Sequence, residues 1–241
     1  MSTSAKVTAR QRIENLLDDN SFVEIGAYVK ARNTDFNIQA KDTPSDGVIT
    51  GYGVINGGLV YVYSQDASVL GGSVGEMHAK KIASLYDMAM KTGSPVIGLI
   101  DSTGLRLQES VDGLNAFGQI YMKQSLASGV IPTVTAIFGN CGGGLSIVAG
   151  LSDFTFMEVE NAQLFVNSPN AITENRKEIC DNASAKFQSE EAGNVDFVGT
   201  EAEVIEGIRN LVSVLPSNNE DEASDLECYD DLNRAAEGIE N

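Results

Sequence analysis

A run of glycines limits what this chain can fold into more than any other feature. Residues 139–144 read Gly-Asn-Cys-Gly-Gly-Gly, between the apolar runs 131–138 and 145–149. This order predicts a buried strand, a glycine corner and the start of a helix. Residues without side chains leave backbone N–H groups accessible at the positive end of a helix dipole. Such a corner can bind a phosphate, or it can bind the oxygen of an enolate or tetrahedral intermediate.

Two common phosphate-binding motifs do not fit this corner. A dinucleotide fingerprint requires Gly-x-Gly-x-x-Gly after a first strand, and residues 139–144 lack that spacing. A P-loop ends in Gly-Lys-Ser or Gly-Lys-Thr, and neither sequence follows here. Both nucleotide-binding interpretations of this corner are therefore weak, and the two ligand classes are separated only by the other glycine corners of the chain.

Composition and charge narrow the class of protein further. The 241 residues are 42% hydrophobic, which is enough for a sizeable core in one large domain or two small ones. The formal net charge of −18 argues against nucleic acid as a partner. We expect a folded domain over residues 1–215. An acidic linker or tail is expected over residues 216–241, which hold nine acidic residues and one basic residue.

Other features predict the cellular compartment. No apolar stretch reaches the roughly 20 residues that span a bilayer, and the N-terminus lacks the apolar segment of a signal peptide. The three cysteines, Cys141, Cys180 and Cys228, are far apart and match no zinc-binding spacing. We therefore expect a cytoplasmic protein that binds no metal ion.

Hydrophobic patterning predicts an α/β fold. The β-rich runs 47–55 and 59–64 are joined by Asn56-Gly57-Gly58, which is a strong hairpin signal. Alternating strands and helices follow, which favours a layered, largely parallel sheet. The predicted helices cover residues 7–18, 75–92, 111–128 and 201–215, and the other predicted strands cover residues 22–25, 96–100, 133–138, 154–157 and 162–166.

Three glycine-containing corners occur in order along the chain. The first is residues 65–76, which include Gly71-Gly72-Ser73, and the second is residues 101–109, which begin Asp-Ser-Thr-Gly-Leu-Arg. The third is residues 128–132 leading into residues 139–144. In this order they closely resemble the carboxyltransferase subunits of biotin-dependent acyl-CoA carboxylases and decarboxylases, which belong to the crotonase superfamily. The segments 215–219 and 230–234 resemble the connection between the two halves of such subunits.

The resemblance covers nearly the whole chain and identifies it with the N-terminal half of such a subunit. It implies a crotonase-like ββα-superhelix, the ClpP/crotonase fold. It also implies an acyl-CoA site whose enolate oxygen receives backbone N–H groups from Gly143 and Gly144 and from Gly104 and Leu105. By the same resemblance, acyl-CoA contacts are expected from a wider set of residues: Gly71, Gly72, Ser73, Arg106 and Gly142.

The resemblance further implies a shared active site. The C-terminal carboxyltransferase half of a neighbouring protomer supplies the biotin side, and biotin itself is carried on a partner protein. Expected partners are therefore that C-terminal half, a biotin carrier protein, and either a biotin carboxylase or the membrane subunit of a decarboxylase. A homo- or hetero-oligomer follows from this arrangement. The alternatives are the equivalent half of a methylmalonyl-CoA or glutaconyl-CoA decarboxylase, and a non-catalytic assembly subunit.

Individual side chains carry competing interpretations. Arg106 either forms an ion pair with Glu109 or Asp153, or it orients a phosphate of CoA. His78 is the only histidine and is interpreted as structural or exposed. Cys141 is interpreted as a small packing residue, because no general base is paired with it in the sequence.

The chain also departs from the family pattern in two places. Thr103 and Leu105 replace the glycine and alanine of the usual Asp-Ser-Gly-Gly-Ala-Arg, and the bulk of Leu105 is expected to narrow the acyl pocket. Around residues 180–183 the family shows Leu-Gly-Gly-Ala, whereas this chain has Asp181 and Asn182 in place of the glycines. These differences leave the identity of the acyl group open.

Overall fold

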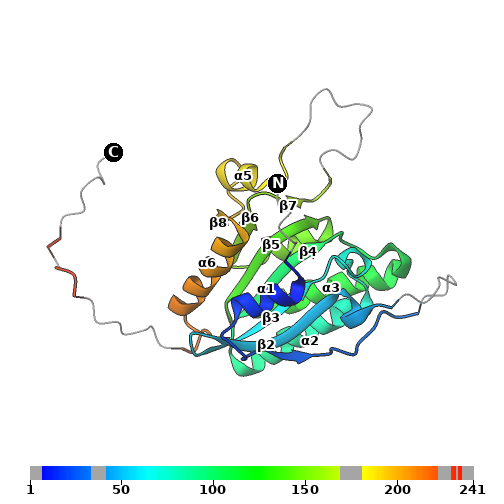
Figure 1. Ribbon diagram of the computed structural model, residues 1–241, viewed down its shortest axis with the longest axis horizontal. Helices are drawn as coiled ribbons and strands as arrows, with labels where there is room; N and C mark the ends of the chain where they lie inside the picture. The colour runs from blue at the N-terminus through cyan, green and yellow to red at the C-terminus, as the bar shows by residue number, and fades with distance from the viewer. Residues whose placement is uncertain (1–6, 34–41, 169–180, 222–228, 232, 235–241) are drawn as a thin grey trace.

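The computed structural model describes residues 7–33, 42–168, 181–221, 229–231 and 233–234. They form one mixed sheet with helices on both faces (Figure 1). The main strand order is β1-β2-β3-β4-β5-β6-β8, and β7 pairs with the end of β5. The predicted α/β class with a largely parallel sheet is confirmed.

The first part of the sheet is an antiparallel hairpin. Strands β2 (Val48–Ile55) and β3 (Gly58–Gln65) pair from Val48↔Gln65 to Ile55↔Gly58. Asn56 and Gly57 both have positive φ, at 50° and 88°, as the tight turn predicted from the sequence requires. The short strand β1 (Val23–Ile25) adds to the free edge of β2.

The second part of the sheet is parallel. Strands β4 (Val96–Ser102), β5 (Thr133–Gly142), β6 (Phe154–Glu158) and β8 (Phe197–Gly199) follow β3 in order. The main connections are helices α2 (Glu76–Thr92) and α3 (Ser110–Ala127). Strand β5 is longer than predicted, because its pairing with β7 (Gln163–Phe165) extends it into the glycine run.

Helices cover the two faces of the sheet separately. Helices α1 (Ala9–Leu16) and α6 (Glu201–Val214) cross the front face in Figure 1 and pack on side chains such as Val62, Leu99 and Ala136. Helices α2, α3 and α4 (Gly144–Gly150) pack on the opposite face, on side chains such as Tyr63, Ile100 and Ile137. Alternate residues of each strand therefore enter different cores.

Several elements differ from the sequence predictions. The sequence pattern missed α5 (Ala185–Glu190) and β8, which are short and carry little periodicity. Three 3₁₀ turns also lie near the carboxyl ends of strands or before β2, at Pro44–Gly47, Leu70–Gly72 and Leu107–Glu109. Helix α6 ends at Val214, beside the proposed boundary at residue 215, and the division at that point stays a prediction. In the described part of the chain, no helix is both long and apolar enough to cross a bilayer.

Candidate active site

The three predicted glycine corners lie at the carboxyl ends of neighbouring strands. The first follows β3, the second follows β4, and the third follows β5. These strands are adjacent and parallel, and Ser102 pairs with Cys141 where β4 and β5 end, after a register shift that follows Ile100. Ligands of open parallel sheets bind at this edge. The fold thus brings together three segments that are far apart in the sequence.

The first corner packs directly on the second. A Cβ atom placed on Gly72 would lie 2.4 Å from the carbonyl oxygen of Asp101, so only glycine allows this approach. The N–H of Thr103 donates to the carbonyl of Gly71 at 2.9 Å, and Ser102 Oγ donates to the carbonyl of Gly72 at 2.6 Å. Gly71 and Gly72 therefore support the second corner. Acyl-CoA contacts by Gly71, Gly72 and Ser73 stay predictions.

A parallel backbone bridge joins the second corner to Val74 of the first corner. Val74 N–H donates to the carbonyl of Gly104 at 2.8 Å, and Arg106 N–H donates to the carbonyl of Val74 at 2.9 Å. This parallel bridge directs the N–H of Leu105 away from Val74, toward the end of β5. The N–H of Gly104 donates to Ser102 Oγ at 3.1 Å. Among the hydrogen bonds of the described residues, none uses the N–H of Leu105.

The third corner depends on an unusual backbone conformation. Gly143 has φ 60° and ψ −126°, which side-chain-bearing residues rarely adopt. Its own N–H donates to the carbonyl of Phe165 at 3.1 Å, because β7 pairs with the end of β5. The expectation that the N–H of Gly143 is an available donor is therefore corrected. The next N–H, of Gly144, begins α4 and has no acceptor among the described residues.

The second and third corners touch. A Cβ atom placed on Gly104 would lie 3.4 Å from the carbonyl oxygen of Gly142, and Tyr121 Oη of α3 donates to the carbonyl of Gly144 at 2.7 Å. Gly142 is buried beneath the ring of Phe165, so a contact between Gly142 and CoA stays a prediction. The N–H groups of Leu105 and Gly144, one from each corner, thus have no acceptor in the described part of the chain.

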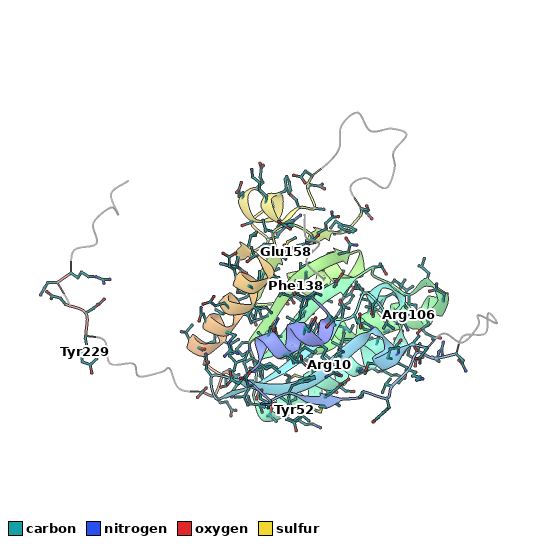
Figure 2. All side chains as sticks on the ribbon, viewed as in Figure 1. Arg10, Tyr52, Arg106, Phe138, Glu158 and Tyr229 are labelled. Carbon is teal, nitrogen blue, oxygen red and sulfur yellow. The ribbon has the colours of Figure 1, made fainter. Side chains whose placement is uncertain are left out.

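Arg106 is buried, and its guanidinium joins Asp46, Glu109 and Ser73; we call this set of contacts the Arg106 clamp. The side chain of Arg106, labelled in Figure 2, is 4% exposed, and Nη1 donates to Asp46 Oδ1 at 2.6 Å and to Glu109 Oε1 at 2.9 Å. Nη2 donates to the carbonyl of Ser73 at 2.7 Å. The prediction that Arg106 contacts CoA is corrected, because the guanidinium is enclosed and engaged. The predicted ion pair with Glu109 is confirmed, whereas Asp153 instead accepts hydrogen bonds from Thr133.

The same polar core contains His78. It is fully buried, Nδ1 lies 2.9 Å from the carbonyl oxygen of Asp46, and Nε2 lies 3.1 Å from Gln65 Nε2. A proton on Nδ1 satisfies both contacts, since Nε2 then accepts from the Gln65 amide. Burial, and to a smaller extent the nearby positive charge of Arg106, lower the pKa of His78 to about 3. The structural interpretation of His78 is confirmed, and a surface position is excluded.

The side chains of Cys141 and Leu105 contribute packing near the site. Cys141 is fully buried, and burial raises the pKa of its thiol to about 12, which agrees with a packing role. The side chain of Leu105 packs toward α3, where a Cβ atom on Gly113 would lie 2.9 Å from Leu105 Cδ1. The expectation that Leu105 narrows the acyl pocket is therefore not supported, because Gly113 provides space for its side chain.

A largely parallel sheet with helices on both faces, and with two N–H groups at its edge that have no acceptor among the described residues, is the arrangement of a crotonase-like fold. The model of the carboxyl transferase domain matches residues 2–240. The chain belongs to this family, which confirms the resemblance inferred from its three corners.

Relatives in this family place the chain within longer proteins. It is 44% identical over 234 residues to the methylmalonyl-CoA decarboxylase subunit alpha of Propionigenium modestum, covering 95% of this chain and 45% of the relative. The chain thus spans about half the length of that relative.

Solved structures agree with the sequence comparison. The transcarboxylase 12S structure, described as a hexamer with methylmalonyl-CoA bound, superposes with a TM-score of 0.84 at 38% identity over 90% of this chain and 43% of that one. The MdcD-MdcE hetero-dimer of a Pseudomonas malonate decarboxylase matches with a TM-score of 0.70 at 26% identity, covering 86% of each chain.

Proposed function

We propose that this chain is the acyl-CoA half of a carboxyltransferase that moves a carboxyl group between biotin and a short acyl-CoA. The observation that carries this proposal is the pair of free N–H groups of Leu105 and Gly144 on touching corners. Two donors from separate backbone segments suit an oxygen that gains negative charge during a reaction. The similarity to a methylmalonyl-CoA decarboxylase subunit and to a transcarboxylase with methylmalonyl-CoA bound supports a CoA thioester as the substrate.

The chemistry at this site is stabilisation of an enolate. Carboxyl transfer at the carbon next to a thioester carbonyl requires negative charge on the carbonyl oxygen, which both N–H groups can accept as hydrogen-bond donors. They cost little reorganisation, because the Val74–Leu105 bridge and the backbone of Gly143 already fix their directions. The nearby ionisable side chains of His78 and Cys141 are buried and neutral at pH 7, so we assign neither a proton-transfer role.

Biotin, carried on a partner protein, would take up the α-proton of the acyl group when it supplies the carboxyl group, and would give up that proton to the enolate carbon when it receives the carboxyl group. We propose that biotin enters from the side of a C-terminal carboxyltransferase half, as the family resemblance implies. The same half-site serves a carboxylase or a decarboxylase, because the two differ in the final acceptor of the carboxyl group. We further propose a cytoplasmic location, a biotin carrier, and either a biotin carboxylase or a membrane decarboxylase subunit as partners.

Calorimetry with matched CoA ligands tests the proposal. Propionyl-CoA contains the thioester oxygen, whereas the thioether S-propyl-CoA lacks it and is otherwise similar. With the C-terminal half present, propionyl-CoA should bind about tenfold tighter, as two hydrogen bonds of modest strength allow. Equal affinity would contradict the oxyanion assignment. Absence of binding by both ligands would instead favour a non-catalytic assembly subunit.

A further inference from the structure

The 3₁₀ turn before β2 has a backbone conformation that its own residues do not favour. Ser45, Asp46 and Gly47 have φ of 52°, 50° and 71°, so three consecutive residues lie in the left-handed region. We call these three residues the left-handed turn. Only glycine adopts this region readily, and other residues enter it singly rather than in runs. Contacts from outside the turn are therefore needed to hold its backbone in place.

Helix α2 supplies such contacts from two buried side chains, three residues apart on one face. Lys81 Nζ donates to the carbonyl of Ser45 at 2.9 Å and also to the carbonyl of Val48, so one ammonium joins the two ends of the turn. His78 binds the middle of the turn, since its N–H donates to Asp46 Oδ2 at 2.8 Å and Nδ1 lies 2.9 Å from the carbonyl oxygen of Asp46. The left-handed turn is thus fixed by α2 at both ends and at its centre.

The left-handed turn reaches the candidate site through Asp46. Asp46 Oδ1 accepts from Arg106 Nη1 at 2.6 Å, and Arg106 Nη2 donates to the carbonyl of Ser73 in the first corner. The bridge between Val74 and Leu105 follows directly after Ser73, and it directs the N–H of Leu105. A displacement of the turn would therefore pass through the Arg106 clamp to this N–H group.

We propose that Lys81 is a positioning residue for the reaction: its charged ammonium holds the left-handed turn and so fixes the direction of the Leu105 N–H. This inference rests on the proposed function for its consequence, the recognition of a thioester oxygen. The stem of Lys81 is enclosed, because a Cβ atom placed on Gly26 would lie 3.1 Å from Lys81 Cε. Charge matters because a hydrogen bond from an ionised donor is about twice as strong as one between neutral groups.

The surroundings of Lys81 make its charge depend on pH. Burial lowers the pKa of Lys81 to about 8, against the opposing negative charges of Glu24 in β1 and Asp46 in the turn. His78, on α2 itself, is neutral, and Arg106 lies on the other side of Asp46. At pH 9 about nine-tenths of the Lys81 side chains are therefore neutral.

The titration of Lys81 does not threaten the fold. Because the folded chain releases this proton near pH 8 and the unfolded chain near pH 10.5, the free energy of unfolding rises with pH between these values. The cost of burying the charge thus exceeds what the charge contributes by holding the turn. Loss of the positioning effect at pH 9 is therefore separable from unfolding.

The affinity ratio of two matched ligands measures the effect of Lys81. Calorimetry with propionyl-CoA and S-propyl-CoA, in the presence of the C-terminal half, gives a ratio in which any unfolded fraction cancels. Wild-type protein should discriminate about tenfold at pH 7 and about threefold at pH 9, as expected when one of two modest hydrogen bonds is lost. Lys81→Met should discriminate about threefold at both pH values, and Lys81→Arg, which stays charged, about tenfold at both.

Lys80→Met is the matched control. Lys80 precedes Lys81 on α2, and its side chain is 46% exposed in a pair with Glu76, so discrimination should be unchanged at both pH values. Equal discrimination by wild-type protein at pH 7 and pH 9 would overturn the proposal, as would undiminished discrimination in Lys81→Met. If Lys81→Arg does not fold, agreement between wild-type protein at pH 9 and Lys81→Met at pH 7 supports the proposal, and disagreement overturns it.

The carbonyl carbon resonance of Gly104 separates this inference from the proposed function, because it requires no ligand. That carbon belongs to the peptide group that carries the Leu105 N–H. In wild-type protein its chemical shift should change with the same midpoint as the Cε resonance of Lys81, and in Lys81→Arg this change should be absent. If it does so while wild-type protein fails to distinguish the two ligands at pH 7, the positioning by Lys81 stands and the oxyanion site does not. If the ligands are distinguished and Gly104 does not follow Lys81, the oxyanion site stands and the positioning does not.

Discussion

The corners after β4 and β5 each hold an N–H group that has no acceptor in the described part of the chain, those of Leu105 and Gly144, but different interactions fix the two corners. The corner after β4 is fixed by side chains: Arg106 joins Asp46, Ser73 and Glu109 around it, and Ser102 bonds to Gly72 and Gly104. The corner after β5 is fixed by the backbone, through the conformation of Gly143 and the pairing of β7 with β5.

This difference explains which sequence changes each corner tolerates. The side chain of residue 105 is free to vary where space exists, because its N–H is directed by the bridge to Val74 and by the clamp. Residue 143 has no such freedom, since ψ of Gly143 sets the direction of the N–H of Gly144. Substitutions in the Arg106 clamp should therefore mainly lower the free energy of unfolding. Substitutions at Gly143 should mainly lower turnover.

Removing the clamp should have the largest effect. Arg106→Met leaves Asp46 and Glu109 as buried carboxylates without their cation, and burial already raises the pKa of Asp46 despite Arg106. Breaking such a pair costs about 3–5 kcal/mol of unfolding free energy. Urea unfolding of the isolated chain measures it. Arg209→Met, which breaks the more exposed pair with Asp18, is the control and should cost about 1 kcal/mol or less. Equal costs would show that Arg106 is not a special support of this corner.

A substitution in the corner after β5 should reduce turnover strongly and the free energy of unfolding less. Gly143→Ala places a side chain at φ 60° and ψ −126°, so the peptide that carries the N–H of Gly144 should rotate. We expect turnover of the assembled enzyme to fall about 10²–10³-fold, the usual cost of losing one oxyanion donor. The cost in unfolding free energy should be only about 1–3 kcal/mol.

Gly150→Ala is the matched control for Gly143→Ala. Gly150 lies in the same short helix, and a Cβ atom there would meet nothing within 4 Å, so activity should be retained. Gly144→Val is less informative, because its Cβ atom would lie 2.7 Å from Tyr121 Oη and would disturb packing as well. Near-normal turnover of Gly143→Ala would remove this corner from the proposed site.

The buried His78 beneath the first corner should make the free energy of unfolding depend on pH. The pKa of His78 is lowered to about 3, so the unfolded chain binds a proton near pH 6.5 while the folded chain does not. The stability contributed by neutral His78 is thus present above pH 6.5 and is lost as pH falls toward 3. From pH 7 to pH 5 this loss amounts to about 2 kcal/mol.

His78→Asn isolates that contribution, because asparagine retains a donor for the carbonyl of Asp46 without titrating. The variant is less stable at pH 7, and its disadvantage should shrink by about 2 kcal/mol at pH 5. Denaturant unfolding at both pH values gives the difference. Parallel pH profiles would mean that His78 is not buried in its neutral form.

Features of the fold and of the candidate site could be predicted from the sequence where the interacting residues lie close together along the chain. The hairpin at Asn56-Gly57 and the glycine corners are local signals, and the structure confirms the turn and brings the corners together. The i, i+3 pair of Arg106 and Glu109 was likewise visible in the sequence. The partner Asp46 was not, because it lies 60 residues from Arg106 and only the folded sheet brings the two together.

The same reasoning explains the errors at the candidate site. Gly143 was expected to donate to substrate, but the pairing of β7 with the end of β5 uses its N–H. That pairing depends on Gln163–Phe165, a short strand whose partner could not be inferred from its own sequence. Sequence order located the corners, and long-range pairing decided which N–H groups remain free.

The contact between Leu105 and Gly113 should have the smallest effect on stability. It tests whether the Arg106 clamp or the packing of the Leu105 side chain directs the N–H of the corner after β4. Gly113→Ala places a Cβ atom 2.9 Å from Leu105 Cδ1, so the gain of about 1 kcal/mol that alanine brings to a helix should be cancelled. In a Leu105→Ala background that gain should appear in full, and the double-mutant cycle should give a coupling of about 1 kcal/mol. Turnover should stay within about twofold in Gly113→Ala, because Arg106 and the Val74 bridge hold the Leu105 backbone while its side chain moves. A large loss of turnover in Gly113→Ala would mean that side-chain packing, and not the clamp, directs this N–H.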